Sequence, residues 1–455
     1  MSSTMNTMIF RAGPLAAALL LAGCAGFSAD GGFGPVDGMT RERTGQSPVL
    51  ARSGDDDTRQ RARATELLAA PLTADGAVEL AFLNNRGLQA RFAELGVAEA
   101  DLVRAGRLPN PSFSFGRLRH ADGTTEIDRG VTFDVLGLLT MPLAVGVEQR
   151  RLAQVQLDAA DEAVSLAART RRAWVRAVAA QELQRYHARV KDTADAAGEL
   201  AGRMRQAGNF SALARMREQS FAADATARAA RASHDAVAER ERLVRLMGLP
   251  GDTAFTLPDR LPDLPAEPAS IQGTEQAAMD KRLDVQRATR GTETLAKSLG
   301  LTKATRFINV LEIGYQNQSE SGQPRANGYV VELELPIFDG GDARLARAEA
   351  TYQQALHHTA DVALRARSEV REAHAAYQTA WTLARHYRDD VVPLKKRIAA
   401  ENLLRYNGML ISVFDLLADA RSQVEGATGY VESLRDFWLA DTDLRTATTG
   451  GSPTP

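Results

Sequence analysis

Side chains suited to catalysis or metal binding are few in this chain, and their spacing forms no catalytic motif. The chain has seven histidines and one cysteine, and it contains no G-x-S-x-G, no H-E-x-x-H and no Walker glycine loop. His357 and His358 are adjacent and point to different faces of a helix, which does not suit a shared metal ion. Met204, Met216 and Met409 could bind a soft cation, but we expect them to fill a core instead. We therefore expect no enzyme activity, no catalytic residues and no metal.

Cys24 is the residue whose surroundings most clearly indicate a chemical modification. Arg11 precedes a short apolar run over residues 12–20, which is too short to span a bilayer and is typical of a secretory signal. Leu-Ala-Gly-Cys at residues 21–24 resembles a bacterial lipobox, in which the cysteine is acylated once the preceding peptide is removed. We expect residues 1–23 to be a signal peptide, with a covalent lipid on Cys24 and no other cofactor. The alternative is an ordinary signal peptide and an unmodified cysteine.

A pair of carboxylates, Asp415 and Asp419, is a candidate for controlling ion passage. The two residues lie one helical turn apart, so both carboxylates would share one face of a predicted helix. If that face points into a pore, the pair would favour cations and resist closure unless arginines such as Arg405 or Arg215 neutralise it. The alternative is that both are ordinary exposed helix charges.

The composition is that of a chain with a large core and a balanced surface charge. Of its 455 residues, 44% are hydrophobic and 25% are charged, and the formal net charge is −2. A protein that binds polyanions normally carries a marked positive excess, so nucleic acid is not an expected partner.

Long helices dominate the secondary structure that the sequence predicts. No proline occurs between Pro142 and Pro250, and from Leu152 onward apolar residues recur every three or four positions. The helix predicted over residues 143–207 would be roughly 95 Å long at 1.5 Å per residue. A helix of this length must pack side by side with other helices, as in a coiled coil. Gly208 marks a turn in the first half, and Pro393 predicts a kink in the second. The helices predicted in this way cover residues 143–207, 212–247, 342–406 and 412–445.

Two pairs of short strands precede the long helices. Val331 and Leu333 alternate with Glu332 and Glu334, so one face of this strand is apolar and the other is charged. The strands have the length of a tilted strand in a membrane barrel, which needs roughly 9 to 11 residues, although a half-buried soluble sheet would alternate in the same way. The strands are predicted over about residues 112–119, 130–138, 307–318 and 329–338.

The same order of elements occurs twice, which indicates an internal twofold repeat. Residues 85–89 before the first strand pair correspond to residues 282–286 before the second, and residues 170–173 correspond to residues 370–373. The expected fold class is mainly α with β. The predicted segments are a signal peptide at 1–23, a lipidated tether at 24–71 that cannot fold alone, a first repeat at 72–250, a proline-rich linker at 251–270, a second repeat at 271–447 and a flexible tail at 448–455.

These features together resemble the outer-membrane factor family, the TolC-like exit ducts of bacterial efflux pumps. The resemblance covers about residues 72–447 and is most specific in three motifs. Arg-Leu-Pro-Asn-Pro-Ser-Phe at 107–113 enters the first strand, and Glu-Leu-Pro-Ile-Phe-Asp-Gly-Gly at 334–341 leaves the last one. Leu-Ile-Ser-Val-Phe-Asp-Leu-Leu at 410–417 follows the second hairpin turn.

The resemblance implies a homotrimer in the outer membrane of a Gram-negative bacterium. Four strands per subunit would close a twelve-stranded transmembrane β-barrel, and the long helices would form an α-barrel across the periplasm. Closure by three subunits has a physical reason, because each unsatisfied group at a strand edge in lipid costs several kcal/mol. The chain would then be the exit duct of an efflux or secretion system and would pass substrates outward without chemistry.

The resemblance also implies partners and sites. A periplasmic adaptor and an inner-membrane pump would be the protein partners, and the lipid bilayer would surround the barrel. Asp415 and Asp419 from three subunits would form a gate at the narrow end. The chain departs from the family at Met409, where glycine is usual, and at Ala214, where aspartate is frequent. The hairpin tips that would contact the adaptor are Gly208, Asn209, Phe210, Ser211, Gly408, Met409, Leu410, Ile411 and Ser412, and both tip glycines are expected to have positive φ.

A periplasmic coiled-coil adaptor or scaffold lipoprotein that conducts nothing is the competing function. Such a protein would normally show one helical hairpin flanked by glycine-rich β-domains. This chain shows two predicted hairpins and two strand pairs, which favours the duct.

Overall fold

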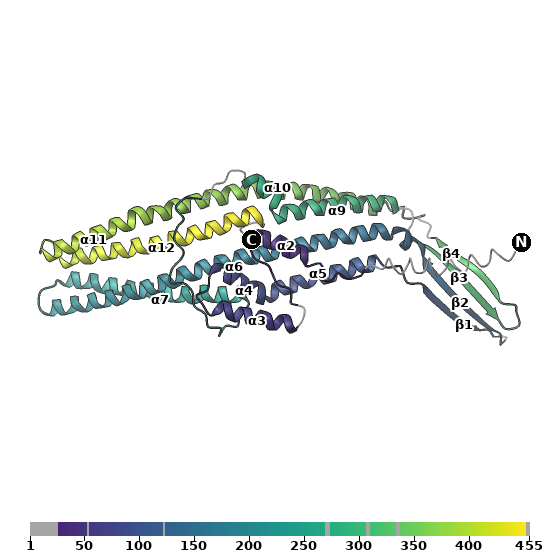
Figure 1. Cartoon of the computed structure of the whole chain (residues 1–455), viewed down its shortest axis with the longest axis horizontal. Helices are drawn as coiled ribbons and strands as arrows, with labels where there is room; N and C mark the ends of the chain where they lie inside the picture. The colour runs from purple at the N-terminus through teal and green to yellow at the C-terminus, as the bar shows by residue number, and fades with distance from the viewer. Residues whose placement is uncertain are drawn as a thin grey trace. The chain divides into compact units, whose positions relative to one another are not determined.

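The chain is mainly helical and contains one four-stranded sheet, which confirms the predicted fold class (Figure 1). The computed structural model describes residues 26–51, 54–121, 123–268, 274–305, 310–333 and 337–451. Cys24 and the signal segment lie outside the described residues, as do Glu334, residues 306–309 and the end of the tail. What the sequence predicts for them stays a prediction.

The chain forms two compact units, and each unit is built from both halves of the repeat. Each repeat supplies two strands to unit 1 and a helical hairpin tip to unit 2, so the compact units do not coincide with the sequence repeats. Unit 1 consists of the chain up to Val36, Phe92–Ala159 and Gln286–Val362. Unit 2 consists of Asp37–Arg91, Ala160–Val285 and the chain from Ala363.

Unit 1 contains an antiparallel sheet in the order β1-β2-β3-β4, so each strand pairs with the next one along the chain. The central pairing of β2 with β3 joins the two halves of the repeat, with Val131 opposite Tyr315 and Phe133 opposite Ile313. The expectation of four strands is therefore confirmed. The strands are β1 (Ser112–Arg119), β2 (Thr125–Asp134), β3 (Leu311–Glu320) and β4 (Ala326–Leu333).

The second strand ends earlier than the sequence predicts, and the cause is local. β2 ends at Asp134, whereas the alternating pattern predicts a strand as far as Leu138. The Asp134 carboxylate accepts a hydrogen bond from the Gly137 backbone N–H at 2.7 Å, which is the geometry of a helix cap. Residues 135–138 are consequently the first turn of α6 (Val135–Gln206).

The starts of two strands also differ from expectation. β2 begins at Thr125 rather than near residue 130, because its ladder with β1 continues as far as the pair of Arg119 and Thr125. β4 begins at Ala326 rather than near residue 329, because its ladder with β3 continues to Gln318. These added residues are mostly polar or small, so they show no apolar alternation in the sequence.

Polar contacts join the helices of unit 1. Arg287 of α9 (Leu283–Thr305) contacts Asp158 of α6 at 3.2 Å. Thr292 of α9 contacts the Thr359 hydroxyl of α10 (Asp342–His386) with 2.8 Å between the two Oγ1 atoms. The helix that leads into β1 is α5 (Arg86–Ala105).

Unit 2 contains two helical hairpins, and a π-helical turn interrupts the second one. This turn lies at Tyr387–Val391, just before Pro393, so the disturbance predicted there takes the form of a π-turn. The Tyr387 ring fits against α12 (Val413–Thr449) because Gly429 has no side chain, and a Cβ on Gly429 would lie 2.6 Å from the ring. The hairpins pair α6 with α7 (Ala212–Met247), and α10 and α11 (Val392–Asn407) with α12.

The core of unit 2 collects apolar residues from both hairpins and from the segment between the repeats. The proline-rich linker packs against the helices as far as it is described, because its four large apolar side chains are buried. Buried core residues include Trp174, Val178, Leu243, Met247, Tyr377 and Phe437 from the helices, and Phe255, Leu257, Leu261 and Leu264 from the linker.

The N-terminal tether contains two helices that the sequence pattern does not predict. They are α2 (Gly34–Thr44) and α3 (Gly54–Leu68). Val36 and Thr40 of α2 are fully buried, at 0% exposure. Short helices with few large apolar residues depend on packing for their stability, so periodicity alone does not reveal them. The remaining short helices are α4 (Ala74–Asn84) and α8 (Thr274–Lys281).

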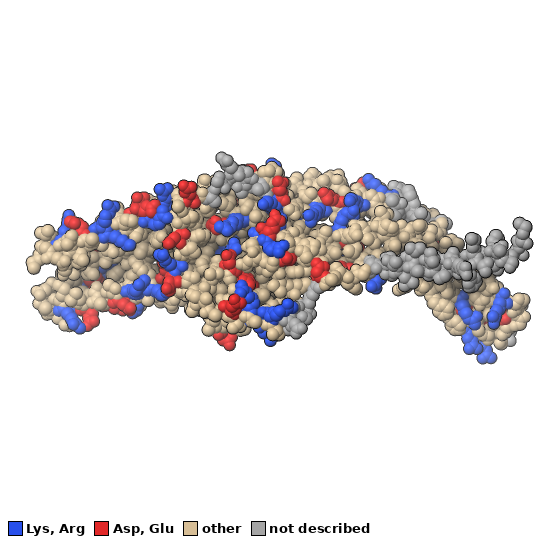
Figure 2. All heavy atoms as spheres, in the orientation of Figure 1, with Lys and Arg blue, Asp and Glu red and all other residues tan. Residues whose placement is uncertain are grey.

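Charged residues are distributed without a dominant sign. Figure 2 shows acidic and basic side chains interspersed over the visible face of the helices, in keeping with the net charge of −2. Among the helices that the structure describes, none has an apolar stretch long enough to cross a bilayer.

Candidate functional site

One face of the sheet carries an apolar band. Residues that lie directly opposite one another in antiparallel ladders point to the same face. Phe113, Val131, Tyr315 and Tyr329 are paired in this way across all four strands. Tyr329 is 85% exposed and Phe113 is 69% exposed, although side chains of this kind are normally buried. A second row on the same face consists of Phe133, Ile313 and Val331. A third row on this face pairs Phe115 with the polar residues Arg129, Asn317 and Asn327.

The other face of the sheet is polar and carries small residues. Val331 and Leu333 belong to the apolar face, so Glu332 between them belongs to the polar face, as the alternation predicts. A sheet with one apolar and one wet face is the arrangement found in the wall of a membrane barrel. A row of paired residues on the polar face consists of Ser114, Gly130, Gln316 and Gly328.

The turn between α6 and α7 is the first of the two predicted tips. Gly208 has a φ of +78°, a left-handed conformation that strains any residue with a Cβ. Ser211 caps α7, because its side chain accepts a hydrogen bond from the Ala214 backbone N–H at 3.1 Å. Gly208, Asn209 and Ser211 are exposed. Phe210 is 5% exposed and packs inward, so its side chain is not part of the tip surface.

The turn between α11 and α12 differs from expectation in its backbone. Gly408 has a φ of −78°, so the expectation of a positive φ at this glycine is wrong. Met409 has the positive φ instead, at +58°, and it occupies the place where the resemblance implies glycine. A left-handed conformation costs a residue with a Cβ roughly 1–2 kcal/mol. Met409 and Leu410 are 93% and 77% exposed, whereas Ile411 is partly buried and Ser412 is exposed.

Gly208→Ala and Gly408→Ala form a matched pair that tests the two tip backbones. We expect Gly208→Ala to destabilise its tip by about 1 kcal/mol, because alanine must adopt a left-handed backbone there. Gly408→Ala should have little effect, because an added Cβ makes only ordinary contact, 3.5 Å from the Leu404 carbonyl oxygen. Hydrogen exchange of the tip amides measures both effects. Equal changes in the two variants would contradict the assignment.

Asp415, a predicted gate residue, helps to cap the N-terminus of helix α12. Its carboxylate accepts a hydrogen bond from the Ser412 backbone N–H at 3.0 Å, and the Ser412 hydroxyl accepts one from the Asp415 N–H at 3.3 Å. This is a capping box. The side-chain and backbone hydrogen bonds of Ser412 lower the pKa of Asp415 below its ordinary value of 3.8. The cap is therefore at full strength above pH 3.8 and is lost as the pH falls through the lower folded-state pKa.

Asp419 and Arg405, one of the two arginines expected to neutralise the aspartates, are both engaged within their own helices. Asp419 accepts a hydrogen bond from the Gln423 side chain at 3.0 Å. Arg405 is paired with Glu401 at 3.0 Å rather than with either aspartate. A role of Asp415 and Asp419 in a constriction stays a prediction.

A buried ion pair that the sequence does not reveal joins the two hairpins near their tips. The Glu218 side chain on α7 is 3% exposed, and its carboxylate accepts a hydrogen bond from the Arg421 guanidinium on α12 at 2.7 Å. The Arg421 guanidinium also lies over the Phe221 ring, 4.5 Å from its centroid. The ion-pair partners are 203 residues apart, so no local spacing could have matched them.

Arg282 is a second buried charge that joins distant elements. Its side chain is 1% exposed, and one guanidinium nitrogen lies 2.6 Å from Asp284 and 2.7 Å from Glu369. The guanidinium also donates to the Ala447 carbonyl oxygen of α12 at 3.2 Å. Burial acts to lower the pKa of Arg282, but the two carboxylates outweigh it and the pKa is raised. The position of Arg282 in the repeated motif at 282–286 is the sequence signal that marks it.

The histidines of the described residues belong to no cluster of the kind that could hold a metal ion. No group of three or more histidine, cysteine or acidic side chains comes together among the described residues. His357 and His358 are both exposed. The expectation that Met216 and Met409 fill a core is wrong, because their exposures are 57% and 93%.

Solved structures similar to this chain include several outer-membrane channels. The outer-membrane channel OprN is 17% identical, with a TM-score of 0.68 over 92% of this chain and 96% of OprN. The MtrE outer-membrane channel of Neisseria gonorrhoeae is 18% identical, with a TM-score of 0.69 over 82% of this chain and 88% of MtrE. The outer membrane protein VceC of Vibrio cholerae is 16% identical, with a TM-score of 0.68 over 83% of this chain and 96% of VceC. No protein-family model and no curated protein sequence matches the chain.

The chain therefore has the fold of outer-membrane channels, and the resemblance to the outer-membrane factor family is confirmed at the level of the fold. A shared fold does not by itself define an activity.

Proposed function

We propose that this chain is the outer-membrane exit duct of an efflux or secretion system in a Gram-negative bacterium, and that it passes substrates outward without chemistry. The observation that carries the proposal is the exposed apolar band on one face of the sheet, where Tyr329, Phe113 and Val331 are each at least 65% exposed. Water does not favour such a surface, whereas lipid does. The likeness of the whole fold to OprN and MtrE, which are outer-membrane channels, supports the same function.

The edges of the sheet require further copies of the chain. β1 and β4 are the first and last strands of the sheet, so each has one side without a partner strand among the described residues. Each unsatisfied backbone group in lipid costs several kcal/mol, so these edges must pair. Pairing of β1 with β4 of the next subunit in a ring of three closes a barrel of twelve strands. The proposed assembly is this homotrimer.

Three further parts of the proposal concern anchoring and partners. A lipid on Cys24 adds a membrane anchor at the N-terminus. A periplasmic adaptor binds the hairpin tips, where Met409 and Leu410 present apolar side chains to solvent. An inner-membrane pump, which is a separate protein, supplies and selects the cargo.

Asp415 and Asp419 give the proposed duct its preference for cations. We expect the Asp415→Asn, Asp419→Asn double variant to lose cation preference, because threefold symmetry would bring six carboxylates together. Asp415 also caps α12, so Ser412→Ala is the matched control: it weakens the cap and keeps both charges. Ion selectivity measured in planar bilayers separates the two roles. Unchanged selectivity in the double variant, or the same change in Ser412→Ala, would contradict the gate.

Planar-bilayer recording of the purified full-length protein tests the proposed function. The duct should insert and conduct ions in discrete steps, and a heat-denatured sample serves as the control. A folded protein that never conducts would favour the competing function, a scaffold or adaptor lipoprotein.

A further inference from the structure

A largely apolar cavity lies in unit 2, and none of its lining residues belongs to the sheet, the hairpin tips or the candidate gate of the proposed duct. It has a volume of about 490 Å³, and it is lined by residues of α6, α12, the start of α4 and the linker at 258–263. Small-molecule sites typically have volumes of roughly 300–1,000 Å³. Trp174 and Trp438 are in its wall, and their indole N–H groups donate to the carbonyl oxygens of Leu72 and Pro262 at 2.7 and 3.0 Å. With these N–H groups satisfied, the indoles present apolar surface to the cavity.

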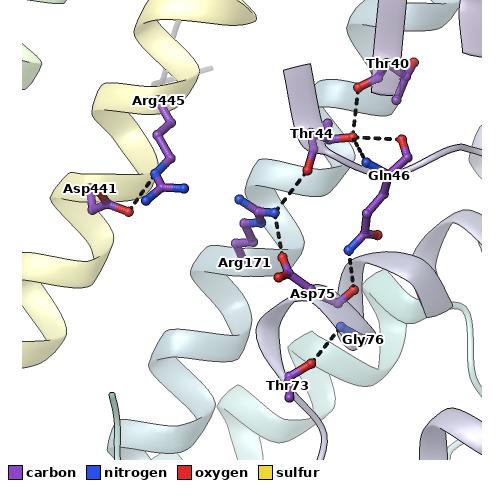
Figure 3. A network of polar contacts seen from close by, with 9 residues as sticks. All are labelled: Thr40, Thr44, Gln46, Thr73, Asp75, Gly76, Arg171, Asp441 and Arg445. Atoms are coloured by element: carbon purple, nitrogen blue, oxygen red, sulfur yellow. Dashed lines mark hydrogen bonds and ion pairs between the residues drawn. The ribbon is translucent and has the colours of Figure 1, made fainter. Parts of the chain in front are cut away.

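A smaller cationic cavity adjoins the apolar one. It has a volume of about 310 Å³ and is lined by three arginines, Arg43, Arg171 and Arg445, together with several threonines and no carboxylate. The two cavities share Arg171, Thr442 and Arg445. Figure 3 shows Arg171 on α6 and Arg445 on α12 extending toward one another from their two helices. The shared arginines therefore lie where the apolar and the cationic spaces meet.

Arg171 and Arg445 each have a carboxylate partner, and Arg171 can still donate a further hydrogen bond. Arg171 contacts Asp75 at 2.7 Å, and Arg445 contacts Asp441 at 2.9 Å. Both carboxylates line the apolar cavity and not the cationic one. The Arg171 Nε atom is buried and has no hydrogen-bond partner among the described residues. A buried donor without a partner costs free energy that a ligand oxygen would recover.

Arg43 adds a buried charge to the same cavity. Its side chain is 5% exposed, and its guanidinium donates to the neutral carbonyl oxygens of Thr449 and Lys281, at 3.1 and 2.8 Å. Its nearest carboxylate, that of Glu42, is 3.6 Å away and largely in solvent. Burial lowers the pKa of Arg43, which means that the site destabilises this positive charge. An anion in the cavity would offset that cost.

We propose that the two cavities form one binding site for a small amphipathic organic anion, with its carboxylate or phosphate between Arg171 and Arg445 and its apolar body against Trp438. Planar guanidinium groups bind both of these head groups with paired hydrogen bonds. The prolines and the indole supply the apolar wall. This inference goes beyond the proposed duct and does not rest on it, because the site lies within one chain.

Titration calorimetry with 1-naphthoate tests the site on the full-length protein in lipid nanodiscs, with empty nanodiscs as the blank. We expect saturable binding, and at least tenfold weaker binding of the neutral 1-naphthamide, which has the same shape. 1-Naphthyl phosphate identifies the preferred head group: tighter binding than 1-naphthoate assigns phosphate, and weaker binding assigns carboxylate. The ligand comparison uses the unaltered protein and does not depend on any variant folding.

Arg445→Gln should weaken naphthoate binding at least tenfold. Its matched control is Arg185→Gln, which removes an α6 arginine that is paired with Asp259 and lies outside both cavities. The absence of saturable binding, equal affinity for naphthoate and naphthamide, or unchanged binding in Arg445→Gln would each overturn the proposal. Inorganic phosphate that binds as tightly as the naphthyl ligands would overturn the role of the apolar cavity.

Discussion

Replacing Arg282 with methionine should lower the free energy of unfolding by about 3–5 kcal/mol, which is the usual cost of removing one partner from a buried ion pair. Arg282 is 1% exposed and holds Asp284 and Glu369, which are themselves 16% and 21% exposed. Methionine preserves much of the packing volume but leaves both carboxylates without their cation. The loss of the bond to the Ala447 carbonyl oxygen adds to the effect. Denaturant unfolding of the purified protein measures the change.

An exposed ion pair provides the comparison for Arg282. Arg371 contacts Glu275 at 3.4 Å, with the two side chains 59% and 48% exposed. Arg371→Met should therefore change the free energy of unfolding by less than about 1 kcal/mol. If Arg282→Met is no more destabilising than Arg371→Met, the buried cluster does not have the structural role assigned to it.

Breaking the Glu218–Arg421 pair should have the second large effect, and it should be concentrated at the hairpin tips. Arg421→Met leaves the Glu218 carboxylate buried without its cation, and a cost of about 3 kcal/mol is expected. The methionine also loses the cation–π contact with Phe221. Hydrogen exchange should show faster opening of α7 and α12 around these residues, with the core near Trp174 unaffected.

A double variant separates the charge effect from a general packing defect. In Glu218→Gln, Arg421→Met the buried charge and its partner are both removed, so the double variant should be more stable than Arg421→Met alone. A double variant that is as unstable as the sum of its two single variants would contradict a coupled pair.

Features with a local sequence signal could be predicted, and the sheet is the clearest case. Val331 and Leu333 alternate with Glu332, and the structure places them on opposite faces as the period of two requires. The same reasoning failed at Asp134, because apolar residues after it continue the pattern while its carboxylate starts a helix. A capping side chain competes with alternation, and the cap prevails there.

Features that depend on distant residues could not be predicted. Glu218 and Arg421 meet only once both hairpins are folded. Helix α2 of the tether is short and buries Val36 and Thr40, so its stability comes from packing rather than from its own sequence. At the second tip the sequence located the turn, but the left-handed residue is Met409 and not the glycine beside it. Glycine usually occupies a left-handed backbone position because it has no Cβ, whereas Met409 adopts this conformation in spite of the strain.

The subunit count of the purified full-length protein in mild detergent tests the central claim most directly, because an exposed apolar sheet with two open edges can form a duct only by closing with copies of itself. Native mass spectrometry should give the mass of three processed chains, each beginning at Cys24 and carrying the covalent lipid on that residue. A monodisperse monomer that retains its native circular dichroism would contradict the account.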